Sequence, residues 1–371
     1  MDKRIKDLAK LLVDYSTEVK KGDKVLVEAY NPATYPIVSE IIKLVYERGG
    51  LPFYRLHEDR VNHSFLSGIS EAQGEILAGV DRSLMEQMNC FIGVRGVMNA
   101  FENSDVKADN MKSYSKTVLQ KVHFEVRVPK TRWVILRWPT PSFAQSAKMN
   151  SEAFEDFFFD ACLVDYAEMS RAMDPLVALM EKTDMVKITS PGTNLEFSMK
   201  DIPVVKCDGH RNIPDGEVYT APVKDSVNGT IKYNTATLYE GQLFDGVELK
   251  FKNGKIIEAN CDVGSVERLN SIFDRDEGAR YVGEFAIGVN PKIKNAILDT
   301  LFDEKIGGSF HFTPGSSYDE APNGNKSVVH WDMVVRQLEE FGGGEMYFDG
   351  KLIRKNGIFV LDELKGLNPN F

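Results

Sequence analysis

The stretch between Asp303 and Val335 places four side chains capable of metal or proton chemistry among β-forming residues and turns, namely His311, Tyr318, His330 and Asp332. His330 and Asp332 are two residues apart. If the apolar run SVVHWDMVV is a strand, both side chains project from the same face. An imidazole beside a carboxylate forms half of a metal site.

The alternative for such a pair is a surface contact or a hydrogen-bonded core histidine, which is the usual role of an isolated His-x-Asp on a strand. His311 makes the metal reading stronger. It sits in a second short alternating run that ends at the turn Pro314-Gly315. Strand ends beside loops are where ligands are commonly assembled.

Two glutamates lie in similar surroundings. Glu217 follows a Pro-Asp-Gly turn in PDGEVYTAP, and Glu284 lies in the apolar run GEFAIG. An unpaired carboxylate is costly to bury among apolar residues, and a metal ion is one way to offset that cost. For either glutamate alone, a salt bridge or an exposed edge position is the competing explanation.

The elements that must position these residues fall into two groups. In the first half, apolar runs alternate with helical patterns, which predicts a parallel, doubly wound sheet. The expected strands are Lys24–Ala29, Pro52–Leu56, Cys90–Val94 and Trp133–Trp138, and the expected helices are Tyr35–Glu47 and about 110–121. A helix over Ser151–Lys182, broken or kinked at Pro175, would close this domain.

From about residue 184 the pattern changes to short alternating strands with turn signals such as Asn253-Gly254. The expected strands include Met185–Thr189, Leu195–Met199, Gly229–Tyr239, Val247–Lys252 and Lys255–Ala259. We therefore predict an α/β domain over residues 1–183 and a β-rich α+β domain over residues 184–371 that carries the metal site. Neither a G-x-G-x-x-G after the first strand nor a P-loop motif is present, which disfavours a nucleotide site.

Composition narrows the function further. The chain has 371 residues, 43% of them hydrophobic, and a formal net charge of −10, which argues against nucleic acid or an anionic membrane as the main partner. Its four cysteines lack the spacing of a zinc or disulfide framework. The N-terminus has the pattern of an amphipathic helix, not of a signal peptide, so a cytoplasmic enzyme is expected.

The ordered motifs PDGEVYTAP, GEFAIG, HFTPGSSY and HWDMV, with DEKIGG before the first histidine, resemble the thermophilic aminopeptidase family of metallopeptidases (peptidase family M29). The resemblance spans the C-terminal domain, whereas the N-terminal half matches in layout more than in motif. It implies two divalent metal ions per chain (zinc, cobalt, manganese or magnesium), peptide substrates with a free N-terminus, and a homodimer. The implied ligands are Glu217, Glu284, His311, His330 and Asp332.

Two such ions can activate one water, polarise the scissile carbonyl and stabilise the oxyanion that forms. Tyr318 matches a tyrosine of that family and could donate a hydrogen bond to the oxyanion, although packing on its own loop is an equally good explanation. The family commonly has an aliphatic-Ala-Leu-Gly segment after the histidine, whereas this chain has Pro314 there. Proline fixes φ and removes an N–H, which predicts a stiffer or differently directed loop before Tyr318. Lys305, Asp319 and Glu320 are further candidates for a general base or a substrate contact.

The predicted function is therefore a metal-dependent aminopeptidase that releases N-terminal amino acids from peptides. Two alternatives come from other classes. One is a non-catalytic metal- or peptide-binding homologue, and the other is a metal-dependent hydrolase of non-peptide amides or esters. The presence of all five implied ligands disfavours the non-catalytic homologue.

Overall fold

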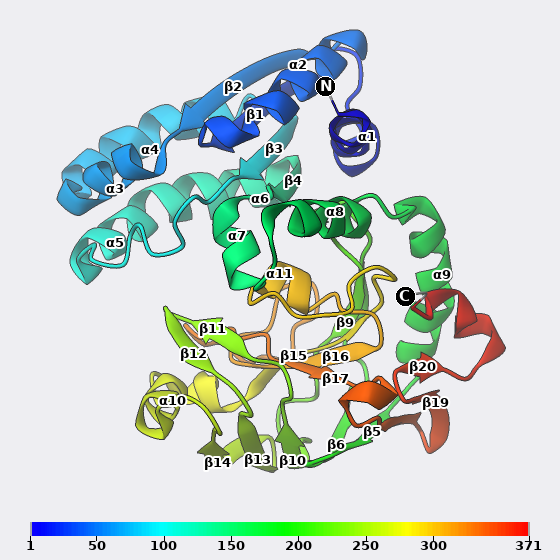
Figure 1. Ribbon diagram of the computed structural model, residues 1–371. Coiled ribbons are helices and arrows are strands. Elements are labelled where there is room, and N and C mark those ends of the chain that lie inside the picture. The colour runs from blue at the N-terminus through cyan, green and yellow to red at the C-terminus, as the bar shows by residue number, and fades with distance from the viewer. Residues whose placement is uncertain (1, 370–371) are drawn as a thin grey trace. The chain divides into compact units, whose positions relative to one another are not determined.

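The computed structural model describes residues 2–369 and divides into two compact units. The first unit comprises Met1–Leu163 and Gly209–Pro214, and the second comprises Val164–Asp208 and Asp215–Phe371. The predicted domain boundary near residue 184 stays a prediction. Each unit has its own sheets, which are described separately below (Figure 1).

The first unit contains a five-stranded parallel sheet in the order β2-β1-β3-β4-β8. Its strands are β1 (Lys24–Tyr30), β2 (Leu51–His57), β3 (Cys90–Arg95), β4 (Arg132–Arg137) and β8 (Asn212–Ile213). The first four strands match the predicted ones to within one or two residues at each end. The order reverses between β1 and β3, so the chain winds outward in both directions from that point.

Helices cover both faces of this sheet because alternate residues of β1 are apolar on each side. Val25 and Val27 are fully buried, and α2 packs against β1. On the opposite face, Leu26 clusters with Phe91 and with Met85 of α4. The helices of this unit are α1 (Lys3–Lys10), η1 (Leu11–Ser16), η2 (Pro32–Thr34), α2 (Tyr35–Glu47), α3 (Asp59–Gly68), α4 (Glu71–Met85), α5 (Ala108–Tyr114), η3 (Ser115–Arg127), α6 (Val128–Lys130), α7 (Pro141–Ser146) and α8 (Ser151–Cys162).

Two helix predictions differ from the structure. The single helix expected over Ser151–Lys182 is two helices, α8 and α9 (Tyr166–Met180), and the chain breaks before Asp165, which caps α9 through the N–H of Glu168. Pro175 lies inside α9 and does not end it. The helix expected over about 110–121 continues to residue 127, because its second part is the π-helix η3.

The second unit is built from antiparallel sheets. An eight-stranded sheet has the order β14-β13-β10-β6-β5-β18-β19-β20, a five-stranded sheet has the order β17-β16-β15-β9-β7, and β11 pairs with β12 (Figure 1). The strands are β5 (Met185–Ser190), β6 (Thr193–Ser198), β7 (Val205–Cys207), β9 (Glu217–Thr220), β10 (Asn228–Lys232), β11 (Thr237–Tyr239), β12 (Gln242–Phe244), β13 (Glu248–Lys252), β14 (Lys255–Asn260), β15 (Val282–Gly288), β16 (Ser309–Pro314), β17 (Val334–Arg336), β18 (Glu345–Phe348), β19 (Lys351–Lys355) and β20 (Ile358–Phe359).

Short helices connect these strands. They are α10 (Val266–Phe273), η4 (Glu277–Arg280), α11 (Thr300–Asp303), η5 (Glu339–Phe341) and η6 (Asp362–Leu367), in addition to α9. The strand expected over Gly229–Tyr239 is divided into β10 and β11. The parallel α/β part and the β-rich part confirm the predicted fold class.

In the second unit, one face of the five-stranded sheet is aromatic and the other carries polar side chains. Phe285 of β15 and Phe312 of β16 pack with Phe197 of β6 in an aromatic core between the two large sheets. Residues at the alternate positions point the other way and carry the candidate site.

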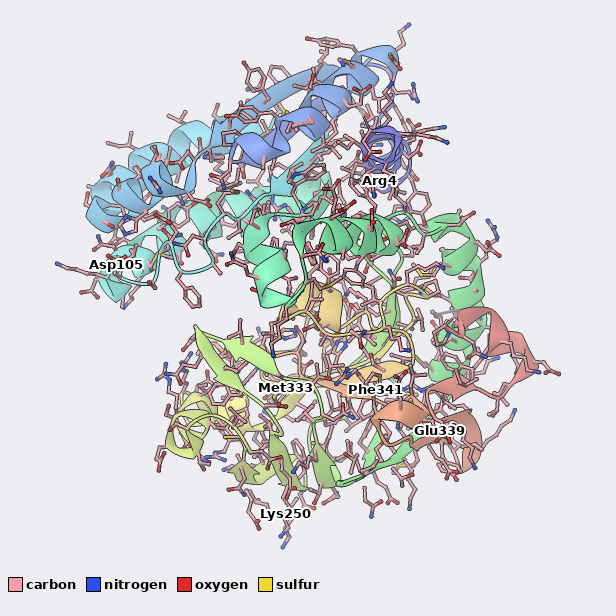
Figure 2. The ribbon with its side chains drawn as sticks, in the orientation of Figure 1. Arg4, Asp105, Lys250, Met333, Glu339 and Phe341 are labelled. Carbon is pink, nitrogen blue, oxygen red and sulfur yellow. The ribbon has the colours of Figure 1, made fainter. Side chains whose placement is uncertain are left out.

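Met333, just before β17, is fully buried, whereas Lys250 of β13 extends away from the unit (Figure 2). Within residues 2–369, no helix is long and apolar enough to cross a bilayer.

Candidate metal centre

Three neighbouring strands bring Glu217, Glu284 and His311 together on one face. In the antiparallel register, Glu217 of β9 lies opposite Gly288 of β15, and His311 of β16 lies opposite Ala286. Glu284 precedes Ala286 by two residues, so it shares their face. All three polar side chains are almost completely buried. Gly288 leaves room there for the backbone of another segment, because a Cβ at this position would lie 2.9 Å from the carbonyl oxygen of Glu304.

His330 and Asp332 reach the same place from an irregular segment. The strand expected over SVVHWDMVV is wrong for its first part, because β17 begins only at Val334 and His330 makes one isolated bridge with Gly315. The two side chains nevertheless meet, with His330 Nε2 and Asp332 Oδ1 3.2 Å apart. Backbone hydrogen bonds tie the segment to β16, from the Trp331 N–H to the Pro314 oxygen at 3.2 Å and from the Phe312 N–H to the Met333 oxygen at 3.2 Å.

Trp331 is 2% exposed and stacks on Tyr239 at 4.4 Å between ring centroids. It also contacts the rings of Phe244 and Phe273, and its Nε1 donates a hydrogen bond to Thr237 Oγ1. The indole therefore points into the core while its two neighbours in sequence point toward the site.

The orientation of His330 suits a metal ligand. Its Nδ1 lies 2.8 Å from the carbonyl oxygen of Ser316, and because a carbonyl only accepts, Nδ1 is the donor. Nε2 then faces Glu284 Oε2 at 3.4 Å and Asp332 Oδ1. Gly283 makes this arrangement possible, since a Cβ at that position would lie 2.1 Å from the Ser316 oxygen. A backbone partner on one ring nitrogen is the common support for a histidine that binds metal through the other.

His311 belongs to two groups of three residues each. Within each group, the ligand atoms all lie within 4.8 Å of one another. One group is Glu284, His311 and Asp332, and the other is Glu217, Glu304 and His311. His311 Nε2 lies 3.0 Å from Glu284 Oε1 and 3.7 Å from Glu217 Oε2. The structure thus brings together all five predicted ligands and adds Glu304.

Glu304 was missed because nothing in its local sequence distinguishes it from an exposed loop charge. It lies in DEKIGG, a stretch that resembles the family as a whole and does not single out Glu304. Its carboxylate is held by Lys305 Nζ at 2.6 Å. A signal was present in the two glycines that follow, since they let the chain approach another strand closely.

Lys305 is a buried ammonium at the base of the site. It is 1% exposed, and its Nζ lies 2.5 Å from Glu217 Oε1 and 3.6 Å from Asp215 Oδ1. Gly288 admits the segment that carries it, because a Cβ on Gly288 would lie 2.5 Å from the carbonyl oxygen of Ile306. Lys305 is thus the charge partner of a candidate ligand, Glu217. The sequence alone made it only one of several candidates for a general base or a substrate contact.

The pKa values record a surplus of negative charge. Burial alone would lower the pKa of His311, but the hydrogen bond with Glu284 and the charge of Glu217 raise it to about 9. Burial alone would also lower the pKa of His330, but the charges of Asp332 and Glu284 raise it well above its usual value. Burial raises the pKa of Glu304, and the Lys305 ammonium only partly opposes this. A divalent cation would meet the same demand for positive charge.

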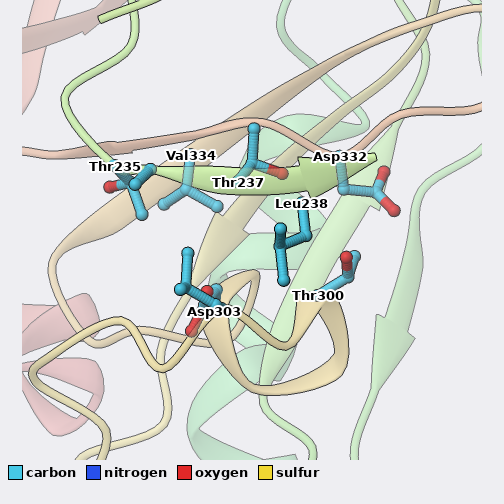
Figure 3. Close-up of a pocket in the computed structure, with 9 residues that line it drawn as sticks. Thr235, Thr237, Leu238, Thr300, Asp303, Asp332 and Val334 are labelled. Atoms are coloured by element: carbon cyan, nitrogen blue, oxygen red, sulfur yellow. The ribbon is translucent and has the colours of Figure 1, made fainter. Parts of the chain in front are cut away.

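A threonine hydroxyl orients the last carboxylate. Thr313, two residues beyond His311 on the same face of β16, donates a hydrogen bond of 2.7 Å to Asp332 Oδ1. Asp332 also lines a small cavity of about 10 Å³, room for about one water molecule, together with Thr237, Thr300 and Asp303 (Figure 3). The hydrogen bond from Thr313 and the small size of the cavity restrict the orientation of the Asp332 carboxylate.

The remaining candidates lie at the edge of the site. The ring of Tyr318 is 4.6 Å from that of His330 and 5.8 Å from that of Tyr219, and the side chain is 46% exposed. Asp319 and Glu320 are exposed in the same loop. The catalytic role of Tyr318 stays a prediction.

The nitrogen and oxygen atoms gathered at the site are chemically suited to bind a divalent cation. Glu217 Oε2 and His330 Nε2 are buried atoms without a hydrogen-bond partner within the described chain. Buried polar atoms normally have partners, so such atoms call for a bound ion or water. Imidazole nitrogens with carboxylate oxygens suit zinc, cobalt or manganese.

Comparison with known proteins decides the family. A family model described as thermophilic metalloprotease (M29) matches residues 1–359. The chain belongs to the M29 family of thermophilic metalloproteases. It is 26% identical to aminopeptidase 2 of Geobacillus stearothermophilus over 409 residues, covering 96% of this chain and 95% of the relative. It is 33% identical to aminopeptidase T of Thermus aquaticus over 157 residues, covering 38% of this chain and 36% of the relative.

Solved structures agree on the fold. Wild-type AmpT from Thermus thermophilus matches with a TM-score of 0.80 at 20% identity, over 97% of this chain and 99% of that one. A 2,5-dihydroxypyridine dioxygenase from Pseudomonas putida matches with a TM-score of 0.61 at 14% identity, over 97% and 98%. The second match is a reminder that this fold carries more than one chemistry, so function must be argued from the site.

Membership in the M29 family confirms the resemblance stated from the sequence. It also confirms the prediction of a metal-dependent aminopeptidase, a hydrolase of peptide bonds, and gives no support to either alternative function. Use of divalent metal follows from the family and agrees with the two groups of carboxylate and imidazole ligands.

Proposed function

We propose that this M29 peptidase removes N-terminal amino acids at a centre of two divalent ions held by five side chains. They are Glu217, Glu284, His311, His330 and Asp332. The observation that carries the proposal is that two groups of ligand atoms share His311 within one buried face. When bound, the ions would supply an activated water and a Lewis acid for the scissile carbonyl. The metal is proposed to be zinc, cobalt, manganese or magnesium.

Three residues of the chain are proposed to act around this chemistry. Glu304 accepts the proton of the attacking water, because its carboxylate lies with the ligand atoms of Glu217 and His311. Lys305 holds Glu304 and Glu217 in place. Tyr318, beside His330, donates a hydrogen bond to the developing oxyanion.

The carboxylates of the site also suit substrates with a free N-terminus. A protonated α-amino group can donate charged hydrogen bonds to a carboxylate, and an acetylated one cannot. We further propose that residues 184–371 form the catalytic domain, since every residue assigned here lies in that range.

The test uses aminoacyl p-nitroanilides and their N-acetyl counterparts. After chelation, addition of cobalt or zinc should restore release from the free-amino substrates only. Glu217→Gln, His330→Ala and Asp332→Asn should each lose activity while keeping the circular dichroism spectrum of the folded protein. Full activity in any one of them removes that residue from the site, and equal release from acetylated substrates contradicts the exopeptidase reading.

Glu304→Gln separates proton transfer from metal binding. We expect kcat to fall by roughly 10²-fold or more, the usual contribution of a general base, with metal content unchanged. A loss of metal in this variant would instead make Glu304 a ligand and overturn its role as the base.

We also propose a homodimer located in the cytoplasm. The first unit exposes large apolar side chains, among them Tyr54 at 64%, Ile76 at 74% and Val80 at 62%. Ile76 and Val80 lie one turn apart on α4, and an exposed apolar helix face of this kind often marks an interface between protein chains. The cysteines are free, which suits a reducing compartment. Light scattering on the purified protein should give twice the chain mass, and a monomer would contradict the proposal.

A further inference from the structure

A second cavity lies wholly within the first unit, and nothing in the peptidase chemistry uses it. It has a volume of about 860 Å³ and is lined from one face of the sheet and from helices α4 and η3. Glu28 and Tyr30 of β1 and Arg95 of β3 reach it from the carboxyl ends of their strands. The strand order reverses between β1 and β3, and ligands of open α/β sheets bind at such points.

Arg127 is a buried cation in the wall of this cavity. It is 5% exposed, and its guanidinium lies over the rings of Phe91 at 4.6 Å and Trp133 at 4.8 Å. Nε donates a hydrogen bond of 2.7 Å to His123 Nδ1. Nη1 is buried without a hydrogen-bond partner in the described chain. Burial and the charge of Arg95 lower the pKa of Arg127 to about 9, so it is still charged at neutral pH.

The nearby acids are committed to other partners. Glu28 Oε1 accepts from Arg95 at 3.0 Å, and Asp81 pairs with Arg55 at 2.8 Å. Among residues 2–369, no carboxylate forms an ion pair with Arg127. A buried charge without a directly paired carboxylate is costly, and a buried polar atom without a partner calls for a bound group that supplies one.

The remaining lining sets the body of that ligand. Aromatic rings from Tyr30, Tyr35, Phe65 and Tyr114 line the same cavity. Its volume falls in the range of small-molecule sites, which typically combine apolar walls with a few polar anchors. A purely inorganic anion would leave the aromatic part of the cavity unused.

We propose that this cavity binds a small organic anion with an aromatic body, whose anionic group meets Arg127. A carboxylate is the simplest such group, because it matches the planar guanidinium. The site is independent of the metal centre and of the proposed function.

The experiment measures binding to the full-length protein by calorimetry and by ligand-observed NMR. The probes are phenylacetate, its neutral counterpart phenylacetamide, and inorganic phosphate. Phenylacetate should bind saturably in the millimolar range expected of a fragment, and the other two should bind more weakly. Equal binding of phenylacetamide overturns the role of charge, and binding of phosphate without phenylacetate overturns the aromatic body.

Arg127→Met removes the charge and keeps an apolar stem. It should weaken phenylacetate binding by roughly tenfold or more, as expected for a charged hydrogen bond, while the melting temperature of the free protein stays equal or rises. Arg48→Met is the matched control, because Arg48 pairs with Asp14 and does not line the cavity. If Arg127→Met fails to fold, Leu119→Trp narrows the same cavity and should also abolish binding. Unchanged binding in both cavity variants, or no binding of phenylacetate to the unaltered protein, overturns the proposal.

Discussion

Replacement of Lys305 by methionine tests whether the base of the metal centre is a true charge network. Its ammonium lies within 2.6 Å of Glu217 and Glu304, and the side chain is 1% exposed. Removing one partner of a buried ion pair typically costs about 3–5 kcal/mol, because the other partner is left as an uncompensated charge. We therefore expect Lys305→Met to lower the free energy of unfolding by about that amount in chelated protein.

The assay is urea unfolding followed by circular dichroism, with the midpoint and the slope both recorded. Lys250→Met is the matched control, since Lys250 also pairs with a glutamate at 2.8 Å but is exposed and should leave the midpoint nearly unchanged (Figure 2). Adding Glu304→Gln to Lys305→Met should recover part of the loss. If the midpoint of Lys305→Met moves no more than that of Lys250→Met, Lys305 does not offset buried charge and the reasoning fails.

Three further outcomes follow from the same geometry. The pKa of His311 is about 9 in the folded chain and about 6.5 when unfolded, so chelated protein should hold its stability below pH 6.5 and lose roughly 3 kcal/mol by pH 9; a flat unfolding profile over that range would count against it. Thr313→Val, which leaves Asp332 without its hydroxyl donor, should weaken metal affinity roughly 10–100-fold, measured by competition with a chelator; unchanged affinity would remove Thr313 from the site. Gly288→Ala should push away the segment packed on it and reduce kcat, whereas Gly79→Ala, whose Cβ meets nothing within 4 Å, should be neutral or stabilising; equal activity in both contradicts the close approach.

The local pattern of apolar and turn-forming residues was enough to predict the helices and strands whose conformation depends mainly on their own residues. Helix α2 runs over Tyr35–Glu47 as predicted, because its apolar spacing and flanking turn signals agree. Strand β1 extends one residue past the expected end. Glu217 and Glu284 could be selected as candidate ligands because a lone acid inside an apolar run stands out, and both are buried in the structure.

Long-range contacts explain what the sequence could not predict. Glu304 is brought to the site by packing of its segment on Gly288, and that neighbour is 16 positions away in the chain. His123 lies in η3, where its ring accepts a hydrogen bond from Arg127 one turn later. The irregular course of the chain around His330 depends on where Trp331 packs, which no window of local sequence contains.

The placement of Trp331 between His330 and Asp332 gives the candidate metal centre a built-in spectroscopic reporter. The chain has three tryptophans, and the other two, Trp133 and Trp138, belong to the first unit. An ion that rearranges the two flanking side chains must act on the backbone of the residue that carries the indole. Emission from this single ring, isolated by replacing the other two with phenylalanine, would then report occupancy of the site without any substrate.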